Sequence, residues 1–174
     1  MTTTFNVGEK AGKDNDNIPN KASFWDDDWQ KHFGGVDTLN RKFTPKENPF
    51  YFALPYGEYD TEGNLKKNVA NVPWYKKDKT IKNRWIEVTY KGKTCYGQWE
   101  DVGPIEEDDF AYVFGSAKPK NKFDTKAGLD ISPTMFHYLG MKDNDITTWR
   151  FVDFADVPDG PWKTTITTRG ISWR

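Results

Sequence analysis

The chain has 174 residues, a length that suits one domain built around one hydrophobic core. Hydrophobic residues make up 36% of the chain and charged residues 29%, a balance typical of a folded protein rather than a disordered one. The net charge is -1 at pH 7 and no basic stripe runs between the aromatic residues, so we expect no nucleic acid partner. The one cysteine, Cys95, excludes an intrachain disulfide and a multi-cysteine metal site.

Aromatic residues make up 16% of the chain, a high fraction. Such rings fill cores, but they also stack on sugar rings and bind partner proteins, so both uses stay open. Cys95 lies in an apolar run and is expected to be a small buried residue, since a catalytic thiol would need His32 or His137 beside it. No run approaches the roughly 20 apolar residues of a membrane span, and we expect no such segment.

Residues 1–20 are mostly Thr, Asn, Asp, Lys and Gly, and we expect them to form a flexible arm. Within them, Asp14 to Asn17 begins like a calcium-binding loop, but the glycine that such a loop needs does not follow. The first residues also lack the apolar core of a secretory signal, which leaves the compartment open because a leader can be removed. Residues 21–174 are expected to form a single domain.

The aromatic spacing near the start of this domain predicts a short helix over residues 24–33. Trp25, Trp29 and His32 recur at the spacing of one helix face, and Gly34 can end the helix. We expect the aromatic face to pack as a lid on the main body. Consecutive acids on a helix point in different directions, so the triplet Asp26 to Asp28 is not expected to bind a metal ion.

Two β-prone runs, Arg84 to Tyr90 and Cys95 to Val102, are joined by Lys91-Gly92-Lys93, which is the pattern of a β-hairpin. Gly103-Pro104 follows the second run at once and predicts a turn. Asp101 therefore falls at the end of a strand, where a rigid backbone can hold a functional carboxylate. The alternative is that Asp101 only bonds to the backbone of its own turn, as Asp often does.

The remaining elements are short. Residues 48–56 are apolar, bounded by prolines, and predict a strand. Ser132 and Pro133 predict the start of a helix over residues 134–139, with Asp130 at the end of the strand before it. Further β-prone runs predict strands over residues 110–114, 149–154 and 163–174. Short strands at modest spacing with two small helices predict a small all-β barrel.

The polar connection over residues 57–82 is long for a compact domain, and ordered loops of this length are often functional. Trp74 within it is either a stacking platform for a ligand or an anchor in the core. The acidic residues 106–109 could bind a cation, but such a run is more often a solvated loop.

The order of these motifs resembles the double-psi β-barrel. A strand ending in Leu54-Pro55 precedes the hairpin, Glu100-Asp101-Val102-Gly103-Pro104 closes it, and Leu129-Asp130-Ile131-Ser132 leads into the short helix. Over residues 48–152 the chain is similar to rare lipoprotein A, the barrel domain of expansins and family-45 endoglucanases. It also resembles a bacterial group of secreted-type proteins that carry Gln-Trp-Glu-Asp-x-Gly-Pro. The resemblance implies a six-stranded double-psi β-barrel with short helices and an N-terminal extension.

The same resemblance implies a pair of functional carboxyls. Asp101 matches the catalytic Asp of rare lipoprotein A, a lytic transglycosylase, and Asp130 matches the general acid of the endoglucanases. Two positions depart from rare lipoprotein A, since Tyr51 replaces a His and Val102 replaces an Arg. We expect Asp130 to act as the acid and Asp101 as the base or its orienting group. The expected substrate-binding residues are Tyr51, Tyr56, Trp74, Trp99 and Tyr112.

We therefore expect a polysaccharide-active protein, a glycoside hydrolase or lytic enzyme that acts on β-glucan or a cell-wall glycan such as peptidoglycan. The expected protein is a secreted or periplasmic monomer that needs no cofactor or metal. The alternative is a non-catalytic, expansin-like carbohydrate-binding module, or a secreted inhibitor or interaction protein, because a fold does not fix a function.

Overall fold

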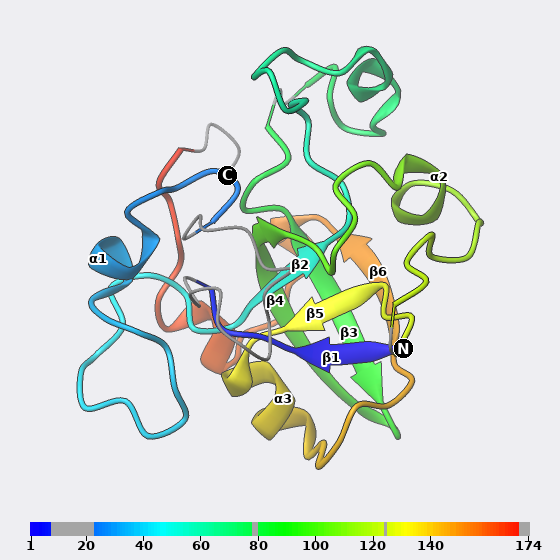
Figure 1. The fold of residues 1–174 in the computed structure, drawn as a ribbon. Helices are drawn as coiled ribbons and strands as arrows, with labels where there is room; N and C mark the ends of the chain where they lie inside the picture. Colours follow the sequence, from blue (N-terminus) through cyan, green and yellow to red (C-terminus); the bar gives the residue numbers. More distant parts are fainter. Residues whose placement is uncertain (8–22, 78–79, 124, 171–174) are drawn as a thin grey trace.

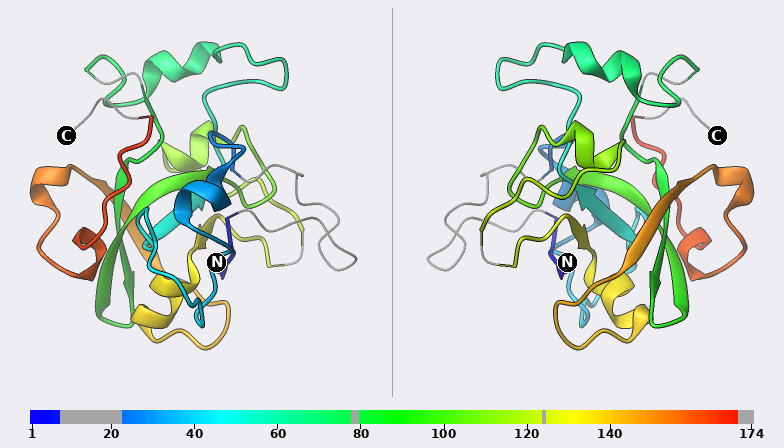
Figure 2. Two further views of the ribbon diagram at one scale, coloured as in Figure 1. Left: turned by 90° about the vertical axis from the view of Figure 1, so that its left-hand side faces the viewer. Right: turned by 90° about the vertical axis from the view of Figure 1, so that its right-hand side faces the viewer.

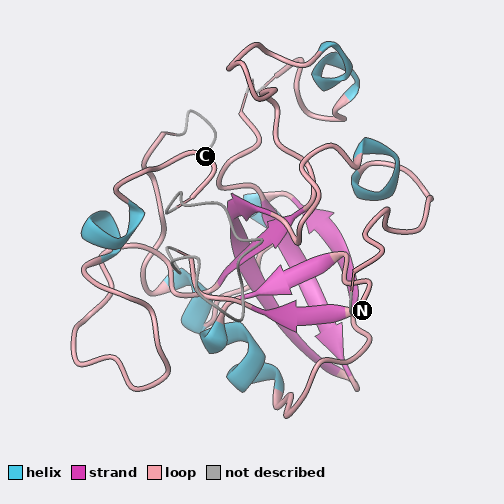
Figure 3. Ribbon diagram, viewed as in Figure 1, coloured by secondary structure: helices cyan, strands magenta, loops and turns pink. Residues whose placement is uncertain are grey.

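The computed structural model describes residues 1–7, 23–77, 80–123 and 125–170. Within these residues, six strands form one curled sheet in the order β1-β5-β2-β4-β3-β6 (Figure 1). The strands are β1 (Thr2–Thr4), β2 (Tyr51–Leu54), β3 (Trp85–Tyr90), β4 (Lys93–Val102), β5 (Leu129–Ile131) and β6 (Thr148–Val152). The helices are short and lie around the sheet (Figure 3): α1 (Trp29–Phe33), α2 (Phe110–Val113), α3 (Pro133–Leu139), and the 3-10 turns η1 (Lys67–Asn71), η2 (Phe154–Asp156) and η3 (Pro161–Lys163).

The predicted hairpin is confirmed and forms the longest ladder of the sheet. β3 and β4 pair antiparallel from Trp85 opposite Gln98 to Tyr90 opposite Lys93. Lys91 and Gly92, at the tip, both have positive φ values, 47° and 82°. A two-residue hairpin loop with positive φ at both positions matches the right-handed twist of the flanking strands, which explains why the chain turns here.

The sheet mixes parallel and antiparallel pairs. β2 is parallel to β4 on one side and antiparallel to β5 on the other, while β1 is parallel to β5. At one end, Thr2 of β1 exchanges two backbone hydrogen bonds with Asp145, just before β6 at the opposite edge of the sheet. The curl of the sheet therefore brings its two edge regions together. The expectation of a β fold is therefore confirmed, as one curled sheet of six strands within the described residues.

α3 confirms the predicted capping. Ser132 Oγ accepts a hydrogen bond from the Met135 N–H at 3.1 Å, and Pro133 occupies the first turn. Gly140 ends the helix with a left-handed conformation, φ 77°. These contacts satisfy backbone groups that would otherwise have no partner at the two ends of a short helix.

α1 is shorter than expected, because it begins at Trp29 rather than near residue 24. The Asp26 side chain accepts the Asp28 N–H at 3.0 Å, a local turn that competes with helical hydrogen bonds. Trp29 and Phe33 stack at 4.4 Å and both pack on Tyr51 of β2, so the ring that accompanies Trp29 is Phe33 rather than Trp25.

Three of the predicted elements differ in the structure. Residues 110–113 are the helix α2, because Phe110 and Phe114 both pack on the Tyr56 ring from one helix face. Residues 164–170 form no strand, since Thr167 bonds through its backbone to the Gln98 side chain instead of to a neighbouring strand. Residues 2–4, expected within the flexible arm, form β1, and the other arm residues after Val7 lie outside the described residues.

Within the connection predicted over residues 57–82, residues 57–77 carry η1 and stand beyond one end of the sheet (Figure 2). Trp74 anchors this connection to the core, because its ring is 8% exposed and packs on Phe114 and Phe151. This placement fits the anchor interpretation of Trp74. Cys95 is fully buried, as expected for a structural thiol.

Candidate functional site

Asp101 and Asp130 lie on either side of one residue of the sheet. Asp101 is the next-to-last residue of β4 and pairs with Ala53 of β2, and Asp130 of β5 pairs with the same Ala53 from the other side. Neighbouring strands are about 4.8 Å apart, so the two aspartate backbones stand roughly 10 Å from each other. Directly paired residues project to the same face of a sheet, and the two carboxyls therefore share one face.

A register shift in β4 puts Asp101 in this position. Phe52 pairs with Trp99, and the next residue, Ala53, pairs with Asp101. Glu100 is thus the extra residue of a β-bulge. Bulges re-aim side chains and are frequent next to active sites. Without the shift, Glu100 rather than Asp101 would face Ala53.

The Asp101 carboxyl accepts two backbone hydrogen bonds on the same oxygen. The N–H groups of Phe24 and Val102 both donate to Oδ1, each at 2.8 Å. Burial raises the pKa of Asp101 to about 7, the negative charges of Asp130 and Glu107 add to the increase, and the two N–H donors oppose it. Because both donors occupy Oδ1, the proton of the neutral acid belongs on Oδ2.

The Asp130 carboxyl has a different environment. The Thr3 hydroxyl of β1 donates to its Oδ1. Burial raises the pKa of Asp130 to about 6, and the Thr3 hydrogen bond opposes that increase. A Cβ at Gly103 would lie 4.0 Å from Asp130 Oδ2, so the turn that follows Asp101 reaches this second carboxyl. Both aspartates are partly exposed.

The five expected substrate-binding rings do not line an open surface. Tyr51, Tyr56 and Trp99 are fully buried, Trp74 is nearly so, and Tyr112 is partly exposed. Trp99 lies next to the pair, and its Nε1 donates to the Asp101 main-chain oxygen at 2.8 Å. A sugar ring needs an accessible aromatic face for stacking, and the four buried rings offer none in this structure.

Each buried ring has a structural partner. The Tyr51 hydroxyl donates to Asp37 Oδ2 at 2.8 Å, and the Tyr56 hydroxyl donates to Asn68 Oδ1 at 2.8 Å. The Arg84 guanidinium lies 4.4 Å from the centre of the Trp74 ring. Tyr112 accepts a hydrogen bond from Trp149 Nε1 at 3.2 Å.

Sequence reasoning did not find the groups that surround the two aspartates from elsewhere in the chain. The sequence predicts that Thr3 belongs to the flexible arm and that the expected helix begins at Phe24, one residue after Ser23. Ser23 donates its hydroxyl to the Glu100 main-chain oxygen at 2.7 Å and so brings the Phe24 N–H to Asp101. No local pattern signals these contacts, because they join positions 77 or more residues apart.

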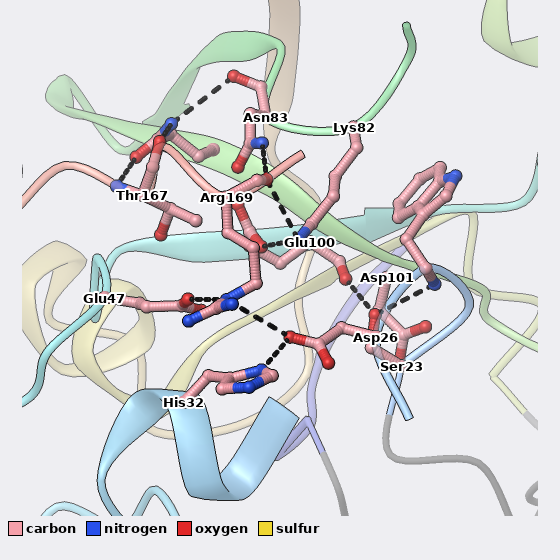
Figure 4. A network of polar contacts seen from close by, with 12 residues as sticks. Ser23, Asp26, His32, Glu47, Lys82, Asn83, Glu100, Asp101, Thr167 and Arg169 are labelled. Carbon is pink, nitrogen blue, oxygen red and sulfur yellow. Dashed lines mark hydrogen bonds and ion pairs between the residues drawn. The ribbon is translucent and has the colours of Figure 1, made fainter. Parts of the chain in front are cut away.

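A network of charged and polar side chains lies beside Asp101 (Figure 4). Lys82 Nζ and Glu100 Oε2 are 3.6 Å apart, and burial raises the pKa of Glu100 to about 8 although the Lys82 charge opposes it. Asp26 Oδ2 lies 2.7 Å from His32 Nδ1 and 3.8 Å from Arg169 Nε. Arg169 also donates to Glu47 Oε1 at 3.1 Å. The network joins β4 to the segments on both sides of it.

Among the described residues, no group of three or more His, Cys, Asp and Glu side chains is arranged to hold a metal ion. The described helices include none long and apolar enough to cross a membrane. Comparison of the chain with protein-family models, curated proteins and solved structures gives no match.

Proposed function

We propose that the chain is a double-psi β-barrel protein that cleaves a polysaccharide with Asp101 and Asp130. The fold part of the proposal is supported by the two parallel pairs, β1 with β5 and β2 with β4, joined through the antiparallel pair β2 with β5. The contact between Thr2 and Asp145, which links the two edge regions, also favours a closed barrel.

The observation that carries the activity is the placement of two half-buried aspartates on one face, on opposite sides of Ala53. Glycoside hydrolysis needs one protonated and one ionised carboxyl. The pKa of Asp101 is raised to about 7 and that of Asp130 to about 6, so Asp101 holds its proton to the higher pH. We therefore assign the acid to Asp101 and the base to Asp130, the reverse of the expectation from the resemblance.

In the proposed reaction, Asp130 removes a proton from a water molecule as the water oxygen attacks the anomeric carbon. The glycosidic C–O bond breaks, and its electron pair stays on the leaving oxygen, which takes the proton of Asp101. Inverting enzymes keep their carboxyls about 6.5–9.5 Å apart to admit this water, against about 5 Å in retaining enzymes. We propose the inverting arrangement, because the two aspartates stand on strands that are separated by β2 rather than on adjacent strands.

A non-catalytic carbohydrate-binding or inhibitory module is the second candidate. It is favoured by the two backbone N–H bonds to Asp101, which a purely structural carboxylate would also make. In both cases we propose a secreted or periplasmic protein whose target is β-glucan or peptidoglycan.

One screen separates the two candidates. Soluble β-glucans and peptidoglycan are incubated with the wild type, Asp101→Asn, Asp130→Asn and the control Asp159→Asn, whose side chain is fully exposed. We expect product release by the wild type and the control, with a loss of at least about 100-fold in each site variant, as for removal of a general acid or base. Binding without product release would favour the module, and full activity in both site variants would refute the assignment.

A further inference from the structure

Residues 23–26, called the strap below, lie against the end of β4 although they are distant in sequence. The Ser23 hydroxyl donates to the Glu100 main-chain oxygen at 2.7 Å and accepts the Trp25 N–H at 3.2 Å. Between them, the Phe24 N–H donates to Asp101 Oδ1 at 2.8 Å. Two consecutive strap residues therefore bind two consecutive residues of β4.

The rings of the strap fix it to the loop after β2 and to the core. A Cβ added to Gly57 would lie 2.3 Å from Phe24 Cζ, so the Phe24 ring fills the space that the glycine leaves. The Trp25 ring stands edge-on to Trp99 at 6.1 Å. Trp25 Nε1 donates to the buried Glu58 carboxylate at 2.8 Å. The position of the Phe24 N–H is thus set by side-chain packing on both sides.

Asp26, the last residue of the strap, is held by a hydrogen bond and an ion pair. Asp26 binds His32 of α1 and faces Arg169 of the C-terminal segment, which also binds Glu47 (Figure 4). A segment fixed at both ends loses little further conformational freedom when its N–H group binds a carboxylate. The strap is therefore a preorganised donor rather than a chance contact.

We infer that the strap is a positioning element for Asp101, and that Ser23, Phe24 and Gly57 act together to place one backbone N–H on Asp101 Oδ1. This N–H stabilises the ionised form of a carboxyl that also faces the negative charges of Asp130 and Glu107. It keeps the proton of the neutral acid on Oδ2. The consequence for catalysis rests on the proposed function, but the positioning itself does not.

Gly57→Ala tests the inference without altering either hydrogen-bonding residue. Gly57 does not have a positive φ, so the substitution acts mainly by pushing the Phe24 ring away. Carboxyl ¹³C NMR titration of the full chain should show the pKa of Asp101 increased by about 1 in Gly57→Ala, the effect of losing one hydrogen bond to a charged group. The double variant Gly57→Ala/Phe24→Ala removes the collision and should restore at least half of the change. The Glu87 carboxyl, bound to Arg150, serves as the internal control and should not shift.

An unchanged pKa of Asp101 in Gly57→Ala, or a full increase that persists in the double variant, would overturn the inference. If Gly57→Ala fails to fold, Ser23→Ala and Ser23→Thr provide the second test. Loss of the hydroxyl should raise the pKa of Asp101, and the threonine hydroxyl should restore it; equal values in both variants would overturn the inference. The titration needs no substrate, so it tests the positioning of Asp101 even if the chain cleaves no glycan.

Discussion

Lys82 and Glu100 form an enclosed ion pair at 3.6 Å, with side chains that are 5% and 0% exposed. Neither Glu100 carboxyl oxygen has a hydrogen-bond partner in the described part of the chain. A carboxylate in such a place loses its hydration and regains only part of that energy from the lysine, which is why its pKa rises to about 8. The pair sits at the bulge that orients Asp101, so its charge state bears on the stability of the site.

The first prediction is that the free energy of unfolding decreases between pH 5 and pH 8. The pKa values of Glu100, Asp101 and Asp130 are all higher in the folded chain than in ordinary carboxyls. In this range the folded state binds more protons than the unfolded state, so raising the pH favours unfolding. Urea denaturation at pH 5, 6.5 and 8 measures the slope. Glu100→Gln should flatten it, and a wild type that is more stable at pH 8 than at pH 5 would contradict the prediction.

The second prediction concerns the partner of Glu100. Lys82→Met leaves a buried carboxylate unpaired and should cost about 3 kcal/mol at pH 9, where Glu100 is ionised. At pH 5 the carboxyl is neutral, and the cost should be clearly smaller. The double variant Lys82→Met/Glu100→Gln should recover most of the loss at pH 9, as chemical denaturation can show. A cost that is the same at both pH values would mean that the ion pair is not the cause.

The sequence predicted the parts of the fold that local chemistry decides. The Lys91-Gly92 turn and the Ser132 and Gly140 caps depend on residues close to one another along the chain, and all three are confirmed. The strand predicted over residues 110–114 failed because the contacts of Phe110 and Phe114 with Tyr56 override their β propensity.

The site itself was only partly predictable. Its two aspartates follow short motifs, but the bulge at Glu100 and the donors from Thr3 and Phe24 arise from pairing between distant segments. The prediction that five ring residues bind substrate rests on the ability of aromatic side chains to stack on sugars. Burial decides which use a ring has, and burial depends on tertiary packing that the sequence does not display.

The third prediction separates a packing role of Tyr51 from a substrate-binding role. Tyr51→Phe keeps the ring in the cluster beneath α1 but removes the hydrogen bond to the buried Asp37. The free energy of unfolding should fall by about 1–2 kcal/mol. KM for a cleaved glycan should not change. Tyr59→Phe, at a ring that is 43% exposed, is the matched control and should change neither quantity. A large increase in KM with unchanged stability in Tyr51→Phe would mean that Tyr51 binds the substrate.

The fourth prediction is electrostatic coupling of the two aspartates. The negative charge of Asp130 contributes to the raised pKa of Asp101, so Asp130→Asn should lower the pKa of Asp101 from about 7. Asp159→Asn, at an exposed carboxyl outside the site, should leave it unchanged. Carboxyl ¹³C NMR titration gives both values. Equal pKa values of Asp101 in the wild type and in Asp130→Asn would mean that the two groups do not act as a pair.

The pH dependence of kcat/KM for a cleaved glycan tests the central claim most directly. An acid with a pKa of about 7 and a base with a pKa of about 6 predict a bell-shaped profile with its maximum between pH 6 and pH 7. The profile should collapse in both Asp101→Asn and Asp130→Asn. A profile that is flat from pH 5 to pH 8, or one that keeps its shape and height in either variant, would contradict the account.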